Sequence, residues 1–527
     1  MISVRPEIPQ PPRLGKTPWF QVAALLLALF HAAAAHSSEP SDKSTPPQAT
    51  SELARQYKQS GDLHVADDDL EKAANAYMQA LDLGKGAFSP AERIQMAVRL
   101  SWADRLARAE TELRSVLELE PNNPDARIPL ARVVSWRGKL TEAIHEADGV
   151  LQQFPDNREA LQIKADALQW KGDLRRAILL YQQLIQKQDD FDARLGLSYS
   201  LLFGGNRTGA EQSRQLLNPT TTNQQNRFSK FQDTFEATVR PKLDLQYLYF
   251  NDSDGNVLDR YGLSQSFWVN NFDLAANFRH TEARDDTRHS SGEDFSFKAY
   301  TNPTESFGVG GKLGFTRLDD GHSSSFLAGE IKLDAKIPNG TVGASVTREV
   351  LTDSAELIEK RIRATIAGLR WSQQLTDRFS VHPAYWYRSF SDVNHAHEAQ
   401  FMSQYLLSFS PKVAIGHRFR YLNYNRQSSS GYFDPNDYYS NRFFVTFYLE
   451  RQRFYLFSDI FVGQQAFKRN GVASKDLAYG GAGSIGFRPI RNLVLELYVE
   501  GGQIAAGTAS EAGYSYLLLG PRCLIRF

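Results

Sequence analysis

The histidines of the segment HAHE are the side chains of this sequence that come nearest to a metal site. His395 and His397 are two residues apart, so on a strand both imidazoles face one side and Glu398 faces the other. Two imidazoles without further converging ligands make a poor zinc site. Because Cys523 is the only cysteine, the chain can form neither an intrachain disulfide nor a thiolate cluster. We expect no metal, no cofactor and no catalytic residue, and therefore no enzyme.

A second kind of chemistry comes from charged side chains at alternate positions of apolar segments. In KVAIGHRFRYLNYNR, Lys412, Arg418, Arg420 and Arg426 share one face. The other members of this set are Arg361, Arg363, Asp244, Glu496 and Glu500. In RIRATIAG, we expect Ile362, Ala364 and Ile366 to form the opposite, apolar face. Such residues would line a polar lumen, either as mutually paired charges or as a track that binds a polymer weakly at many places.

The alternation that positions these side chains begins near Phe228 and continues to the C-terminus. Most of the chain's 22 tyrosines and 33 phenylalanines lie in this half. The apolar runs are about 9 to 15 residues long, which suits tilted membrane-spanning strands. We predict about sixteen antiparallel strands. They begin near residues 234, 259, 271, 292, 305, 323, 340, 358, 378, 397, 411, 438, 451, 475, 490 and 512.

The last strand of this predicted barrel ends on an aromatic residue. GYSYLLLGPRCLIRF places Leu517, Leu519, Cys523, Ile525 and Phe527 on one face and its two arginines on the other. A terminal phenylalanine after an alternating strand resembles the signal read by the barrel assembly machinery of the outer membrane. We therefore expect a transmembrane β-barrel over residues 229–527, in contact with outer-membrane lipid.

The first half of the chain is a helical repeat. Trp102, Trp136 and Trp170 recur at one spacing, and Ala109, Ala143 and Ala177 follow at the same spacing. This period resembles the tetratricopeptide repeat, a helix-turn-helix unit. We predict four or five such units over residues 53–218, forming an α-solenoid. Each tryptophan either packs between neighbouring units or forms a rung that touches a sugar or a peptide.

The N-terminus has the order of a secretory signal. Basic residues precede the apolar run WFQVAALLLALF, and small residues follow it. We predict a signal peptide over residues 1–36, with an uncleaved anchor as the alternative, and a linker over residues 37–52. Lys plus Arg and Asp plus Glu number 60 each, so the composition gives no support to nucleic-acid binding.

The order of signal peptide, repeats and barrel resembles outer-membrane exopolysaccharide export proteins. These are the cellulose-synthase export subunit, the poly-N-acetylglucosamine porin and the smaller YaiO-type barrel family. Within the barrel, GYFDPNDYYS is similar to an element of cellulose-type export barrels through Gly431, Tyr432, Phe433, Pro435 and Tyr438 or Tyr439. The same segment also fits a simple turn fixed by Asp434, Pro435 and Asn436. Those exporters carry many more repeats than this chain, whose length matches the smaller family better.

The resemblance implies a pore in the outer membrane of a Gram-negative cell that exports a polysaccharide, with the repeats in the periplasm. The repeats would guide the polymer or recruit periplasmic or envelope proteins. Two other functions stay open: a closed barrel that anchors an interaction scaffold or acts as a receptor, and a small-solute porin. The sequence alone also does not exclude a barrel enzyme that acts on lipid or sugar.

Overall fold

The computed structural model describes residues 47–505 and 513–527. The chain divides into two compact units, Met1–Gly172 and Asp173–Phe527. The predicted signal peptide and residues 37–46 of the predicted linker lie outside the described residues. Residues 47–52 of that linker are helical instead, because α2 begins at Pro47. No helix among the described residues is long and apolar enough to cross a membrane.

The first unit is a series of antiparallel helix pairs. Its helices are α2 (Pro47–Ala66), α3 (Leu70–Gly84), the short η1 (Lys85–Ala87), α4 (Pro90–Trp102), α5 (Leu106–Leu119), α6 (Pro124–Trp136), α7 (Leu140–Gln153) and α8 (Arg158–Lys171). Three helices begin at a polar N-cap: Ser89, Asn123 and Asn157 accept hydrogen bonds from backbone N–H groups of α4, α6 and α8. The predicted repeat starts at Pro90, Pro124 and Arg158 are therefore confirmed as helix starts.

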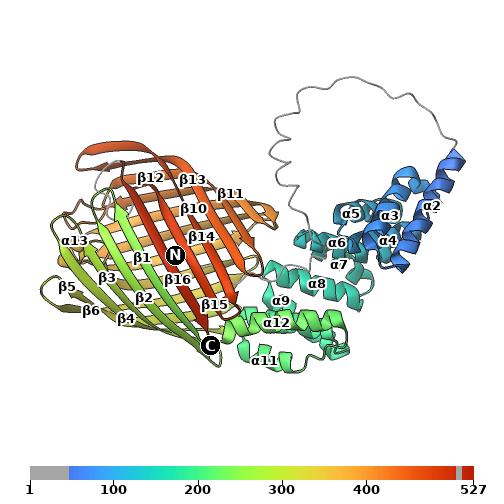
Figure 1. The fold of residues 1–527 in the computed structure, drawn as a ribbon, viewed down its shortest axis with the longest axis horizontal. Helices are drawn as coiled ribbons and strands as arrows, with labels where there is room; N and C mark the ends of the chain where they lie inside the picture. Colours follow the sequence, from blue (N-terminus) through green and yellow to red (C-terminus); the bar gives the residue numbers. More distant parts are fainter. Residues whose placement is uncertain (1–46, 506–512) are drawn as a thin grey trace, which may run out of the picture. The chain divides into compact units, whose positions relative to one another are not determined.

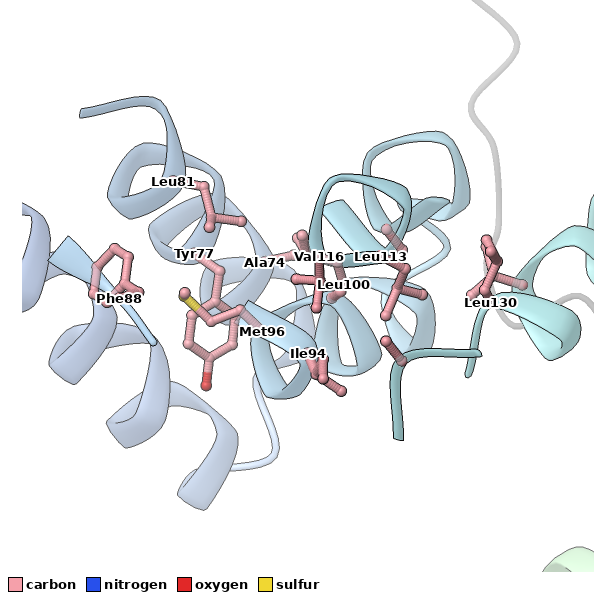
Figure 2. Close-up of a cluster of buried hydrophobic side chains, with 14 of the residues drawn as sticks. Ala74, Tyr77, Leu81, Phe88, Ile94, Met96, Leu100, Leu113, Val116 and Leu130 are labelled. Atoms are coloured by element: carbon pink, nitrogen blue, oxygen red, sulfur yellow. The ribbon is translucent and has the colours of Figure 1, made fainter. Parts of the chain in front are cut away.

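The core of this unit consists of small and branched side chains between successive helices. Figure 2 shows Tyr77, Met96, Leu100 and Leu113 within this buried cluster. The predicted alanine positions Ala109 and Ala143 are fully buried, as expected where two helices approach closely. Tyr77 also donates a hydrogen bond to Asp62 at 2.8 Å, which satisfies its buried hydroxyl.

The second unit begins with four helices. These are α9 (Leu174–Lys187), α10 (Phe191–Gly204), α11 (Arg207–Gln215) and α12 (Thr222–Val239). The prediction of a strand near residue 234, and of a barrel that begins at residue 229, is wrong because α12 covers this stretch. Phe231 and Phe235 are four residues apart, so on a helix they share one face. Both are buried, and Tyr199 of α10 packs edge-on against Phe231 at 4.7 Å.

Sixteen antiparallel strands form the rest of the unit and close on themselves. They are β1 (Lys242–Asp252), β2 (Val257–Val269), β3 (Phe272–Arg284), β4 (His289–Thr304), β5 (Phe307–Asp319), β6 (Ser324–Ile337), β7 (Gly340–Val350), β8 (Arg363–Gln374), β9 (Phe379–Phe390), β10 (His395–Phe409), β11 (Lys412–Tyr424), β12 (Asn436–Glu450), β13 (Phe454–Arg469), β14 (Val472–Ile490), β15 (Leu493–Gln503) and β16 (Ser515–Arg526). β1 pairs with β16 to close the barrel (Figure 1). The predicted architecture and strand number are confirmed.

Alternation gives the barrel an apolar outer surface and a polar inner one. Outward-facing Leu327 and Phe443 are 66% and 68% exposed, whereas Glu398 and Asp459 face inward and are buried. The face predicted for β8 is reversed: Ala364 is buried and Ile366 packs against a buried apolar cluster, while Thr365 is exposed. Apolar residues face inward here because loops fill this end of the lumen.

The two ends of the barrel carry different connections. At one end the strands are joined by short turns, such as residues 270–271, 338–339, 410–411 and 451–453. At the other end lie the longest connections of the described part of the chain, residues 351–362 and 425–435. The short helix α13 (Ala355–Glu359) belongs to the first of these. We call this end the mouth of the barrel.

Candidate functional site

An ion-pair group on the inner wall, near the short-turn end, links the first strand of the barrel to the last two. Arg522 of β16 donates to Asp244 of β1, with Nη2 and Oδ2 2.7 Å apart, and to Glu496 of β15 at 3.3 Å. Three strands that meet at the closure are thereby linked. The structure thus brings together Asp244 and Glu496, two of the predicted lumen residues, through an arginine that the sequence prediction placed on the same inner face.

A second charged group lies on the inner wall closer to the mouth, and we call it the upper lumen group. Its members are Arg388, Arg418, Arg420, Arg442, Glu398 and Asp459. Glu398 of β10 accepts from Arg420 of β11 at 2.8 Å and from Arg388 of β9 at 2.5 Å. Arg418 makes a bidentate pair with Asp459 of β13. Guanidinium and carboxylate planes match each other in this arrangement. The predicted lumen positions Arg418 and Arg420 do face inward, and both are paired.

The other predicted lumen residues have varied surroundings. Lys412 begins β11 at the short-turn end, on the same inner face as Arg418. Glu500 accepts hydrogen bonds from Tyr498 and Tyr516 on the inner wall. Arg363 begins β8, and its guanidinium lies 5.0 Å from the ring centre of Phe326.

Arg361 and Arg426 do not lie on strands. Arg361 follows α13 and pairs with Asp320 of the β5–β6 loop at 3.3 Å. Arg426 lies in the β11–β12 loop and contacts the carbonyl of Asp392. The prediction that Arg426 shares a strand face with Arg420 is wrong because β11 ends at Tyr424. Whether any of these residues contacts a polymer stays a prediction.

The GYFDPNDYYS segment folds into the mouth. Gly431 has a φ of +86°, and a Cβ there would lie 2.7 Å from Oε2 of Glu356. Tyr432 stacks on Phe390 with ring centres 4.6 Å apart. Phe433 packs edge-on against Phe467 at 5.2 Å. The segment is therefore more than a simple turn: it buries its aromatic residues between strand ends.

Together these side chains form an apolar layer at the mouth, which we call the mouth layer. Its larger part consists of Leu357, Ile362, Ala364, Phe390, Ala396, Leu422, Tyr424, Tyr432, Phe433, Tyr438, Phe467, Ala505 and Tyr514. Its smaller part consists of Leu258, Ala283, Leu318, Val350, Ala355 and Ile358. The helix α13 contributes to both parts and contacts β3, β4 and β5 although it connects β7 to β8. The two parts together draw on strands from most of the circumference of the barrel mouth.

Polar contacts fasten the β11–β12 loop to its neighbour. Asp392, in the β9–β10 loop, accepts from Ser428 and Ser430 at 2.7 Å each and from Tyr432 at 2.8 Å. Burial alone would raise the pKa of Asp392, but these donors outweigh it and hold the pKa below its usual value. Asp434 is fully buried and accepts from Arg469 at 3.0 Å.

Helices of the second unit contact the short turns at the other end of the barrel. Asn271, in the β2–β3 turn, accepts from the backbone N–H of Arg207 at 3.0 Å and of Thr208 at 3.3 Å, at the start of α11. The Arg207 guanidinium lies over the ring of Trp268. Arg491, in the β14–β15 turn, pairs with Asp233 of α12 at 3.1 Å.

The remaining candidate residues lie outside the lumen. His397 shares a hydrogen bond with Tyr385 at 2.6 Å, while Glu398 faces the opposite side and binds arginines. Across residues 47–505 and 513–527 there is no group of three or more side chains able to hold a metal. Trp102 ends α4, is 38% exposed and lies 4.3 Å from the Arg99 guanidinium. Trp136 and Trp170 are half-buried. Phe527 is exposed at the end of the last strand.

Sequence reasoning missed several residues of the upper lumen group. Arg388, Asp459 and Arg442 were not among the predicted residues, although β12 and β13 alternate as clearly as β11. For Arg442 the sequence already contained the signal, because in RFFVTFYLE this arginine alternates with the apolar residues of the outward face. The mouth layer could not be found this way, because its members come from strand ends and loops that are distant in sequence.

Comparison with known proteins supports the assignment of the repeats. Residues 103–167 match the family model described as a tetratricopeptide repeat. No curated protein matches the chain.

Several solved structures are similar in part. One, described as a bacterial polysaccharide outer membrane secretin, is 11% identical, with 55% of this chain and 98% of that chain covered and a TM-score of 0.45. CdiB from Acinetobacter baumannii is 10% identical, with 55% and 60% covered and a TM-score of 0.35. A tetratricopeptide repeat protein from Parabacteroides merdae is 15% identical, with 36% and 75% covered and a TM-score of 0.30. At such low identities and TM-scores, these likenesses carry no conclusion about function.

Proposed function

We propose that the protein is an outer-membrane pore that exports an extracellular polysaccharide, with its tetratricopeptide repeats in the periplasm. The observation that carries this proposal is a closed sixteen-stranded barrel with a charged inner wall, joined to a helical repeat domain. A barrel of this strand number can enclose an aqueous lumen. Paired charges along the wall favour many weak contacts over one deep binding site, as conduction requires.

The outer surface of the barrel supports a membrane location. Large apolar side chains such as Leu313, Leu327, Ile331, Phe443 and Leu477 are each at least 60% exposed. A water-soluble protein rarely exposes so many large apolar groups over a continuous surface. Lipid is the environment that makes such a surface favourable, and the exposed Phe527 fits a signal for barrel assembly.

The lengths of the connections between the strands support an orientation in which the short turns face the periplasm. Bacterial barrels have short turns on the periplasmic side and longer loops outside. The contacts of Arg207 and Asp233 place α11 and α12 against the short turns. The repeats then belong to the periplasm, where they can guide the polymer or recruit envelope proteins.

The mouth layer has a direct consequence for this function. We infer that the layer narrows the mouth, so export of a polymer requires the β11–β12 loop and the α13 segment to separate. The same layer favours the second candidate function, in which a closed barrel anchors a scaffold. A small-solute porin with an accessory domain is the remaining alternative, and it predicts defects in uptake.

A strain that lacks this protein tests the export function. We expect surface polysaccharide to be lost and to return when the full chain is supplied. Normal surface polymer in the deletion strain, together with a barrel that stays electrically silent in bilayers, contradicts export. If full-length protein then recovers envelope proteins but no glycan from a pull-down, the scaffold function replaces it.

A further inference from the structure

The upper lumen group carries more positive than negative charge. Four arginines lie on the inner faces of β9, β11 and β12, and two carboxylates, Glu398 and Asp459, face them. Arg442 of β12 stands directly opposite Arg418 of β11 in the strand register. Like charges in this position destabilise a strand pair. One arginine of this opposed pair has no carboxylate among the described residues to compensate its charge.

Arg442 is that cation. Glu398 is shared by Arg388 and Arg420, and Asp459 is occupied by Arg418. Among residues 47–505 and 513–527, no carboxylate lies within ion-pair distance of Arg442, and its guanidinium lies 5.0 Å from the ring centre of Phe461. Each of the other arginines of the group therefore has a carboxylate partner, while Arg442 has none and can receive an anion.

Unused hydrogen-bond donors surround Arg442. Its Nε, the Nε2 of Gln465 and the Oγ of Ser440 are buried and have no partner within the described part of the chain. Ser440 and Arg442 are neighbours on the inner face of β12, and Gln465 of β13 pairs with Ser440 in the register. Leaving a buried donor unpaired costs about 1–3 kcal/mol. Three such groups side by side indicate a ligand rich in acceptors.

The orientation of Gln465 is fixed by its other contacts. Its Oε1 accepts from the backbone N–H of Ala505 at 2.9 Å and from Tyr438 at 3.4 Å. The amide nitrogen is then the free end, and it is a donor only. Gln465 is 1% exposed and Ser440 is fully buried. The donors are therefore held in place by the mouth layer itself, since Tyr438 and Ala505 belong to it.

We propose, on the basis of the export function above, that the exported polysaccharide is acidic and that its carboxylates bind at Arg442, flanked by Ser440 and Gln465. A planar guanidinium matches a carboxylate in two parallel hydrogen bonds, and neutral sugar hydroxyls offer no such match. The site lies immediately beneath the mouth layer, because Tyr438 is four residues from Arg442 on the same strand face.

Binding of defined oligosaccharides to the full-length protein in detergent tests this site. The probes are an oligogalacturonate, a cello-oligosaccharide of equal length and sulfate at equal ionic strength, measured by titration calorimetry. The wild-type chain is compared with a mouth-open variant, in which a short Gly-Ser segment replaces residues 427–433. We expect the mouth-open variant to bind oligogalacturonate about tenfold more tightly than either other probe, a difference of about 1.4 kcal/mol.

Substitutions in the mouth-open variant then assign the site. Arg442→Gln should remove the preference for oligogalacturonate, whereas Arg279→Gln, which changes another inner-wall arginine on β3, should leave it in place. Equal affinity for acidic and neutral probes, sulfate binding as tight as oligogalacturonate, or equal effects of the two substitutions overturns the proposal. If the mouth-open variant conducts ions but binds no oligogalacturonate, the acidic substrate is wrong while the pore stands. If it neither conducts nor binds, both proposals fail.

Discussion

The hydroxyl of Tyr432 donates a hydrogen bond to Asp392 at the barrel mouth, with the two oxygens 2.8 Å apart. The tyrosine belongs to the β11–β12 loop and the aspartate to the β9–β10 loop, so this bond holds two loops together. The ring of Tyr432 meanwhile packs against the rings of both Phe390 and Tyr424, which also contact each other. Tyr432 therefore takes part both in the polar contacts between the two loops and in the apolar packing of the mouth layer.

Removing this hydroxyl should loosen the mouth without emptying the layer. Tyr432→Phe keeps the stacked ring and loses a hydrogen bond to a charged group, which is worth about 1.5–3 kcal/mol. We expect faster proteolysis of residues 425–435 in reconstituted vesicles. Tyr439→Phe, at an outward-facing position on β12, is the matched control and should not change the rate. Equal rates for the two variants would show that the bond does not hold the loop.

The mouth should also respond to acid. Hydrogen bonds from Ser428, Ser430 and Tyr432 hold the pKa of Asp392 below its usual value. The attachment is then complete above the pKa of a solvated aspartate, about 3.9, and is lost as the pH falls through the lower pKa of the closed loop. Proteolysis of the loop in acid, measured with an acid-stable protease, should rise for the wild type.

The Asp392→Asn variant separates this cause from general acid effects. It should cleave faster near neutral pH and show little further change in acid. Asp286→Asn, in the exposed β3–β4 loop, should keep the wild-type profile. A wild-type rate that is independent of pH contradicts the role given to Asp392.

The upper lumen pairs should contribute strongly to barrel stability. Glu398 is buried between two arginines, and removing one partner of a buried ion pair costs about 3–5 kcal/mol. Glu398→Gln should therefore lower the free energy of unfolding in detergent by several times more than Glu282→Gln, which changes a rim residue of β3 with a 43% exposed side chain. Similar losses for both variants would mean that the pairing around Glu398 is energetically unimportant.

In the helical repeats, burial separates two neighbouring residues of α4. Leu100 is fully buried, and Leu-to-Ala substitutions at such sites cost about 2–5 kcal/mol. Trp102 is 38% exposed, so Trp102→Ala should lower the helical unfolding temperature of the full chain less than Leu100→Ala does. If Trp102→Ala instead lowers the unfolding temperature more than Leu100→Ala does, packing is the main role of Trp102. Loss of glycan binding without loss of stability would instead support its contact with sugar.

The repetitive parts of this fold could be predicted from sequence. Helix starts at Pro90 and Pro124 follow from a fixed spacing, and inward charges such as Asp244 and Arg418 follow from alternation. Both signals are local, because a helix or strand repeats its environment every few residues.

The parts that depend on distant contacts could not be predicted. The segment around Phe231 contains aromatic residues like the strands, yet it forms α12 because Tyr199 and its neighbours bury that face. Ala364 and Ile366 face inward, although an apolar face on a barrel usually meets lipid, because α13 and the β11–β12 loop pack onto them. The free state of Arg442 likewise depends on which carboxylates the neighbouring strands bring near.

Ion conductance of the full-length protein in planar bilayers, with and without residues 427–433, tests the central claim most directly. The wild type should be closed for most of the recording, because the mouth layer packs apolar side chains from most of the circumference at the opening. The variant that lacks this part of the layer should conduct steadily. A variant that remains silent contradicts a pore and leaves the closed-barrel scaffold as the function.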